Sequence, residues 1–175
     1  MNETLKILKE RRSVRRYEAR PVEREKLDAI LEAGKYAPSA KGQQSVTMVV
    51  LTKREDIAEL SALNAAVMGT SSDPFFGAPC VVVVLADPEA TNAANAQRDG
   101  SLTMGNLMNA AHALGLGSCW IHRAREVFDS PEGQALLHQW GLEGTYAGVG
   151  HCILGYPATD LPPAPPRKPG RVVRV

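Results

Sequence analysis

The stretch GAPCVVVVLAD, residues 77–87, is apolar at every position from Ala78 to Ala86. A strand with one face in water alternates apolar and polar side chains, and this one does not. The pattern therefore predicts a strand whose two faces are both covered, as in the middle of an α/β sheet. It is much shorter than the roughly 20 apolar residues of a membrane-spanning helix.

Helical and strand patterns continue on both sides of this segment. A first helix, capped by Asn2 or Thr4, is expected to bury Leu5, Leu8 and Ile7. Further helices are predicted within residues 22–37, 56–64, 96–117 and 131–141, and further strands at 46–52, 118–123 and 147–157. In the helix at 22–37 the apolar stripe is Leu27, Ile30, Leu31 and Gly34; in the long helix at 96–117 it is Leu102, Leu107, Ala110, Ala111 and Leu114.

The last segment, residues 157–175, is rich in proline and cannot form a helix. It predicts an extended arm, and its final RVVRV is typical of a short strand. Such an arm could pair with the sheet edge of a second subunit, or it could be a frayed terminus.

Composition limits the possible functions. The chain has 20 basic and 19 acidic residues among 175, which argues against broad attraction to nucleic acid or to an anionic membrane. Cys80, Cys119 and Cys152 fit neither a disulfide framework nor a metal-ligand spacing, so no metal site is expected. With no membrane span and no secretory leader, the expected location is the cytoplasm.

The segment ERRSVRRY, residues 10–17, concentrates positive charge in an otherwise balanced chain. If it is helical, Arg11, Arg12, Arg15 and Arg16 share one face that suits a nucleic-acid backbone. If it is extended, Arg11, Ser13 and Arg15 point to one side and suit a single phosphate. Val14 and Tyr17 favour the extended form, although a solvated basic turn is a third reading.

Five segments, in this order and spacing, resemble the FMN-dependent nitroreductase family. They are ERRSVRRYEARPV, ILEAGKYAPSAKGQQ, GAPCVVVVLAD, NLMNAAHALGLGSCWIH and ILGYP, and together they span nearly the whole chain. The resemblance implies one α+β domain over residues 1–175, with a central, mostly antiparallel sheet flanked by helices. It also implies a homodimer with FMN at the subunit interface, in which the arm at 157–175 wraps the partner and adds a strand to its sheet.

The same resemblance implies a function. Such a protein passes hydride from NAD(P)H, through flavin N5, to an electron-poor small molecule such as a nitroaromatic or a quinone, in a ping-pong sequence. The flavin makes and breaks the bonds, so no catalytic acid–base pair of side chains is expected. The alternative is an FMN-binding protein that does not turn over NAD(P)H.

Carried over by position, the resemblance assigns a set of flavin-binding residues. Arg11, Arg12, Ser13 and Arg15 would hold the phosphate and the pyrimidine edge, and Asn64 would bond the ring edge. A loop from the other subunit would supply Pro38, Ser39, Ala40, Gly42 and Gln44. The strip Trp120, Ile121, His122 and Arg123 would lie beside flavin N5, and Arg167 and Lys168 of the arm would return to the phosphate.

Two features depart from the family pattern. Residues 42–46 read GQQSV where the family has Asn-x-Gln-Pro-Trp, so part of the ring contact or of the substrate pocket must differ. His122 stands where larger members carry an acid. Trp120 could belong to the core or form a wall of the flavin site.

Overall fold

A computed structural model describes residues 2–175. It contains an antiparallel sheet of β1 (Val46–Leu51), β2 (Cys80–Ala86), β4 (Ala147–Gly155) and β3 (Gly117–Ile121), in that spatial order. The helices are α1 (Glu3–Glu10), α2 (Arg24–Lys35), α3 (Arg54–Met68), α4 (Ala93–Ala113), α5 (Ala124–Phe128) and α6 (Pro131–Gln139), with a 3₁₀ turn, η1, at Ala40–Gly42. The predicted α+β class is confirmed.

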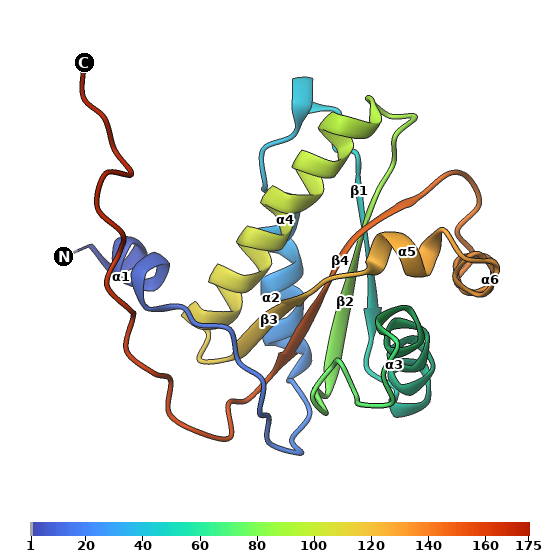
Figure 1. Cartoon of the computed structure of the whole chain (residues 1–175), viewed down its shortest axis with the longest axis horizontal. Helices are drawn as coiled ribbons and strands as arrows, with labels where there is room; N and C mark the ends of the chain where they lie inside the picture. Colours follow the sequence, from blue (N-terminus) through green and yellow to red (C-terminus); the bar gives the residue numbers. More distant parts are fainter. Residues whose placement is uncertain (1) are drawn as a thin grey trace.

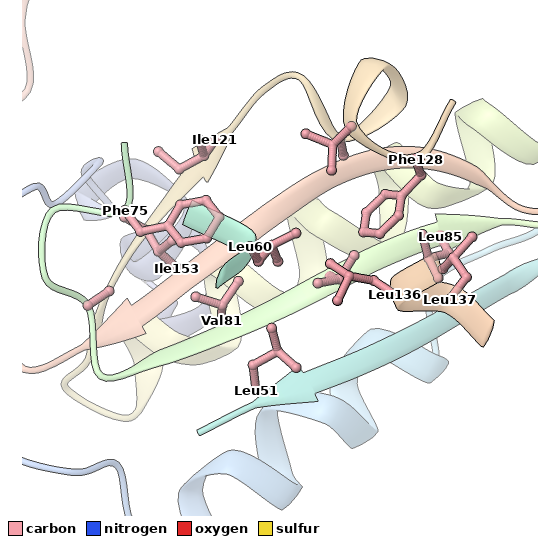
Figure 2. Packing of buried hydrophobic residues seen from close by; sticks show 14 of the residues in the cluster. Leu51, Leu60, Phe75, Val81, Leu85, Ile121, Phe128, Leu136, Leu137 and Ile153 are labelled. Carbon is pink, nitrogen blue, oxygen red and sulfur yellow. The ribbon is translucent and has the colours of Figure 1, made fainter. Parts of the chain in front are cut away.

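The apolar strand β2 lies inside the sheet, and both of its faces are buried. Val81, Val83 and Leu85 pack into one cluster with α3, α5 and α6, which Figure 2 shows from close by. The alternate residues of β2 pack into a second cluster with α2 and α4 on the opposite face. Figure 1 shows these two helical layers on either side of the sheet. The uninterrupted apolar run is explained, because each face has its own core.

Several predicted elements have different limits in the structure. The helix expected at 56–64 extends over residues 54–68 and ends at Gly69, which has a left-handed φ of 70°. The strand expected at 118–123 ends at Ile121. Helix α5 was not predicted, because five residues are too few to establish a helical period.

For the first helix, the predicted N-cap is confirmed and the predicted burial of its leucines is wrong. The Asn2 side chain accepts a hydrogen bond from the Thr4 backbone N–H, as expected of an N-cap. However, no residue of α1 is buried, and Leu5 and Leu8 are 54% and 52% exposed. Leu102 of α4 is likewise exposed, whereas Leu107 and Ala111 are buried as predicted. None of the helices within residues 2–175 combines the length and the apolar character needed to cross a bilayer.

The arm beyond Pro157 leaves the body of the protein and is almost entirely exposed (Figure 1). Its first residues pair with the arginine segment, since Ala158 N–H donates to the Arg16 carbonyl at 3.0 Å. The final RVVRV forms no strand within this chain, so its expected strand stays a prediction that needs a partner.

Candidate functional site

The arginine segment is extended along the outer edge of β3. Val14 N–H donates to the Ser118 carbonyl at 2.9 Å, and Ser13 forms a parallel bridge with Ser118. Val14 is buried, and a Cβ on Gly117 would lie 2.6 Å from a Val14 methyl group, so the segment packs tightly here. Ser13 and Arg15 are exposed on the other side. The helical alternative, with its nucleic-acid face, is therefore wrong.

Two buried guanidinium nitrogens at the start of this segment have no hydrogen-bond partner among residues 2–175. They are Nη1 of Arg11 and Nε of Arg12, whereas Nη1 of Arg12 donates to the carbonyls of Lys9 and Arg11. Burying a charged N–H without an acceptor is costly, so these two nitrogens have capacity for an acceptor such as an anion. With the exposed Ser13 hydroxyl nearby in the chain, these groups fit a phosphate monoester.

The turn between β3 and α5 holds the second group of predicted residues. Ile121 is buried, His122 is exposed, and Arg123 has a left-handed φ of 71° immediately before α5. The Trp120 indole is partly buried against the α2–α4 core, with its ring centroid 5.8 Å from that of His122. The left-handed conformation of Arg123 is strained for a non-glycine residue, so it persists only where the surrounding structure holds it.

Asn64 of α3 supplies that support. The residue is fully buried; its Nδ2 donates to the His122 carbonyl at 2.8 Å, and its Oδ1 accepts from Arg123 Nε at 3.1 Å. The amide is thus engaged with the turn that would meet flavin N5. Its assignment to the ring edge itself stays a prediction.

His151 of β4 lies beneath the same turn. Its Nδ1 is 3.4 Å from Asn64 Nδ2, and its ring packs between Phe75 and Phe128. Complete burial lowers the pKa of His151 to about 4, so the imidazole is neutral at pH 7. Its Nε2 is buried without a partner.

The loop at 38–44 lies elsewhere on the same chain. Ala40 N–H donates to Oδ1 of Asp99, in the N-terminal half of α4. Arg11 and Arg12, in contrast, act electrostatically on His112, near the C-terminal end of α4. At about 1.5 Å per helical residue, positions 99 and 112 are roughly 20 Å apart. In the described part of the chain, no hydrogen bond joins this loop to the arginine segment or to the β3–α5 turn.

Arg167 and Lys168 lie in the exposed arm. The arm begins at a clamp that the sequence did not reveal. Tyr156 OH donates to a Glu23 carboxylate oxygen and accepts from Lys26 Nζ at 2.8 Å, while the Arg20 guanidinium lies 3.9 Å above its ring. This cluster fixes the point where the arm leaves β4.

A cavity of about 610 Å³ lies between α3 and the loop before β2, lined partly by Arg54, Ser61 and Asp73. None of the predicted flavin-binding residues lines it. The Asp73 carboxylate accepts hydrogen bonds from the Ser61 hydroxyl and from the backbone N–H groups of Phe75 and Gly77. Asp73 therefore shapes this loop.

Comparison with known proteins identifies the family. The family model described as "Nitroreductase family" matches residues 8–156. The chain belongs to the nitroreductase family. The prediction made from five sequence segments is therefore confirmed.

Individual relatives agree with this membership. The chain is 30% identical to the FMN reductase [NAD(P)H] of Bacillus subtilis, over 99% of this chain and 73% of that protein. It is 33% identical to an Archaeoglobus fulgidus protein provisionally named NADH dehydrogenase/NAD(P)H nitroreductase, over 91% and 88% of the two chains. A crystal structure of a Bacteroides fragilis nitroreductase with bound FMN superposes with a TM-score of 0.90, at 29% identity and full coverage of both chains.

Proposed function

We propose that this nitroreductase-family protein is an NAD(P)H-dependent flavin oxidoreductase that binds FMN through Arg11 and Ser13. The observation that carries the proposal is the buried, unpartnered Arg11 Nη1 beside an extended segment anchored to β3. A phosphate monoester supplies the acceptor oxygens that this nitrogen lacks. Homologous proteins of known structure carry FMN, which has such a phosphate.

Bound FMN would supply the redox chemistry, taking hydride from NAD(P)H at N5 and returning two electrons to a second substrate. The chain's own contribution is binding and orientation. Arg15, exposed beside Ser13, would place positive charge near the pyrimidine edge and stabilise negative charge there. The backbone N–H groups of the β3–α5 turn, held by Asn64, would orient N5.

We propose a homodimer in which each flavin is bound by both subunits. The loop at 38–44 is bonded to residue 99 of α4 and the arginine segment acts on residue 112, and these two positions are about 20 Å apart along the helix, which favours contributions from two chains. The exposed Leu5 and Leu8 of α1 give an apolar surface that a partner would cover. The arm at 157–175 would bring its RVVRV segment to a partner's sheet edge, and β1 is the edge strand that has no pairing on its outer side within residues 2–175.

The proposed acceptor is an electron-poor small molecule such as a nitroaromatic or a quinone. NAD(P)H and the acceptor would use the same flavin face in turn, a ping-pong sequence. This is supported by the sequence, which has no Gly-x-Gly-x-x-Gly fingerprint of a separate dinucleotide site.

The decisive experiment is the visible absorption spectrum of the purified protein, before and after anaerobic addition of NADH and then NADPH. Flavin bands that bleach with either nucleotide support the proposal and identify the donor. Flavin bands that persist with both favour a binding protein without turnover. A colourless protein that fails to take up added FMN contradicts the proposal.

A paired variant tests the proposed contacts of Arg11 and Arg15 with FMN. Arg11→Gln with Arg15→Gln is expected to weaken FMN binding by at least 100-fold, because two charge-assisted contacts are lost. Arg16→Gln with Arg24→Gln removes the same charge from exposed positions and is the matched control. Equal FMN affinity of both double variants would show that neither the phosphate nor the pyrimidine edge is bound by these two arginines.

A further inference from the structure

Asp99 is a buried acid on the inner face of α4. It is 4% exposed and lies on the same helical stripe as the buried Ala96, Gly100 and Thr103. Its Oδ1 accepts the Ala40 N–H at 2.9 Å, and its Oδ2 accepts the Ser45 hydroxyl at 2.8 Å. No ion pair within residues 2–175 includes Asp99. Its carboxylate is therefore stabilised by hydrogen bonds from neutral donors and not by an ion pair.

The loop between these two contacts has an unfavourable backbone conformation. Lys41, Gly42 and Gln44 have φ values of 53°, 68° and 52°. For Lys41 and Gln44 this left-handed conformation is costly, because each carries a Cβ. Within the loop, Ser39 Oγ accepts the Gln44 N–H at 3.0 Å. The backbone N–H groups of Gly42 and Gln43 also donate within the loop, to the carbonyls of Ser39 and Ala40. From outside the loop, Asp99 binds one residue on each side of the strained section, and the Asp87 N–H donates to the Ser45 carbonyl at 2.8 Å.

We propose that Asp99 is a positioning residue that pre-forms the loop at 39–45 for contact with the flavin ring of the partner subunit. This inference rests on the proposed function, because it takes the flavin as the group that the loop meets. Asp99 acts through the loop: within residues 2–175, its carboxylate is hydrogen-bonded to the Ala40 backbone N–H and to the Ser45 side chain. An ordered loop binds more tightly, because its conformational entropy has already been lost.

The chemistry of the two contacts explains why a hydrogen-bonding side chain of this shape is needed at position 99. An aspartate oxygen only accepts, and both partners here, a backbone N–H and a hydroxyl, can donate. Asparagine can also satisfy both, because its Oδ1 would accept from Ala40 and its Nδ2 would donate to Ser45 Oγ. Alanine satisfies neither contact. The proposal thus predicts that Asp99→Asn largely preserves the loop and that Asp99→Ala releases it.

Two measurements test the proposal. The first is cleavage of the FMN-free protein by trypsin after Lys41, which is exposed in the loop, followed by mass spectrometry. The second is the Kd for FMN, from the quenching of flavin fluorescence. The variants are Asp99→Ala, Asp99→Asn and Ser45→Ala. Ser61→Ala is the matched control, because Ser61 is another buried serine that donates to an aspartate, Asp73, away from the loop.

For Asp99→Ala we expect cleavage after Lys41 to be at least 10-fold faster and the Kd for FMN to be at least 10-fold higher. For Ser45→Ala, the cleavage rate and the Kd for FMN should lie between those of the parent protein and those of Asp99→Ala. For Asp99→Asn and Ser61→Ala, both quantities should stay within about 3-fold of the parent protein. If Asp99→Ala does not fold, Ser45→Ala against Ser61→Ala decides the question.

Unchanged cleavage in Asp99→Ala, or faster cleavage with an unchanged Kd, overturns the proposal. A general loss of stability would accelerate cleavage at many sites and would equally overturn it, since the effect must be confined to the loop. If the parent protein binds no FMN at all, the proposed function fails, and the cleavage pattern still shows whether Asp99 orders the loop. The two failures are therefore distinguishable.

Discussion

The side-chain amide of Asn64 donates to the main-chain carbonyl of His122 at 2.8 Å, which links the middle of α3 to the turn that follows β3. The same side chain accepts from Arg123 Nε, the side chain of the left-handed residue of that turn. One buried residue thus holds the backbone that is proposed to orient flavin N5.

Replacing Asn64 with alanine should lower the free energy of unfolding by about 2–4 kcal/mol, because two buried hydrogen bonds are lost and a cavity remains. It should also slow reduction of bound flavin by NAD(P)H. Urea unfolding and stopped-flow absorbance measure the two effects. Asn106→Ala is the control, since Asn106 donates to the Ala33 carbonyl at 2.9 Å in the other helical layer. Equal flavin reduction rates in the two variants would contradict the role of Asn64.

His151 predicts a specific pH dependence of stability. Burial among Phe75, Phe128 and Asn64 lowers the pKa of His151 from 6.5 to about 4, and the nearby Arg123 charge acts in the same direction. Between these two pH values the unfolded chain binds more protons at this position than the folded one. The stability that the neutral, buried His151 allows is therefore fully present above about pH 6.5. As the pH drops towards 4, the free energy of unfolding falls by about 3 kcal/mol.

Urea unfolding at a series of pH values measures this effect. His151→Leu should flatten the fall between pH 6.5 and 4, whereas His138→Gln, at an exposed position, should leave it unchanged. If the free energy of unfolding of His151→Leu still falls with pH as steeply as that of the parent protein, other titrating groups cause the fall.

The clamp at Tyr156 predicts a second titration. Its hydroxyl donates to Glu23, and with the Arg20 guanidinium it lowers the pKa of that carboxyl from 4.5 to about 2. Because the folded pKa is depressed, this stabilisation is present above about pH 4.5 and is lost as the pH falls towards 2.

Tyr156→Phe should raise the pKa of Glu23, as measured by NMR titration of its carboxyl group. It should also increase backbone motion where the arm begins, at Pro157 and Ala158. Tyr36→Phe, at a tyrosine that is 79% exposed, is the control. A Glu23 pKa that stays near 2 in Tyr156→Phe would show that the Tyr156 hydroxyl is not what lowers it.

The parts of the fold that were predictable are those that local pattern determines. The unbroken apolar run of β2 requires cover on both faces, and the stripe containing Leu27 and Ile30 requires a helix against one of them. The extended arginine segment followed from Val14 and Tyr17, which disfavour a helix, and in the structure Val14 is buried against β3.

The supporting residues of the site were not predictable in this way. Asp99, Asn64 and His151 acquire their partners from segments at least 50 residues away, and no local spacing encodes that. A signal for Asp99 did exist, since an acid on the buried stripe of a helix needs an explanation. Leu5 and Leu8 were wrongly expected to be buried, because helical periodicity identifies an apolar face and not what covers it.

That uncovered face leads to the last prediction. Leu5 and Leu8 lie on the exposed side of α1, and in the proposed dimer a partner surface would cover this helix, which has no buried residue within its own chain. Leu5→Glu with Leu8→Glu should therefore weaken the proposed dimer by at least 10-fold, because two charges would be desolvated in the interface. Sedimentation velocity over a range of concentrations measures the dimer affinity. Met68→Glu with Val67→Glu, at exposed apolar positions near the end of α3, is the control. If the two double variants have the same dimer affinity, α1 lies outside the interface. The two-subunit flavin site must then be assembled through other surfaces.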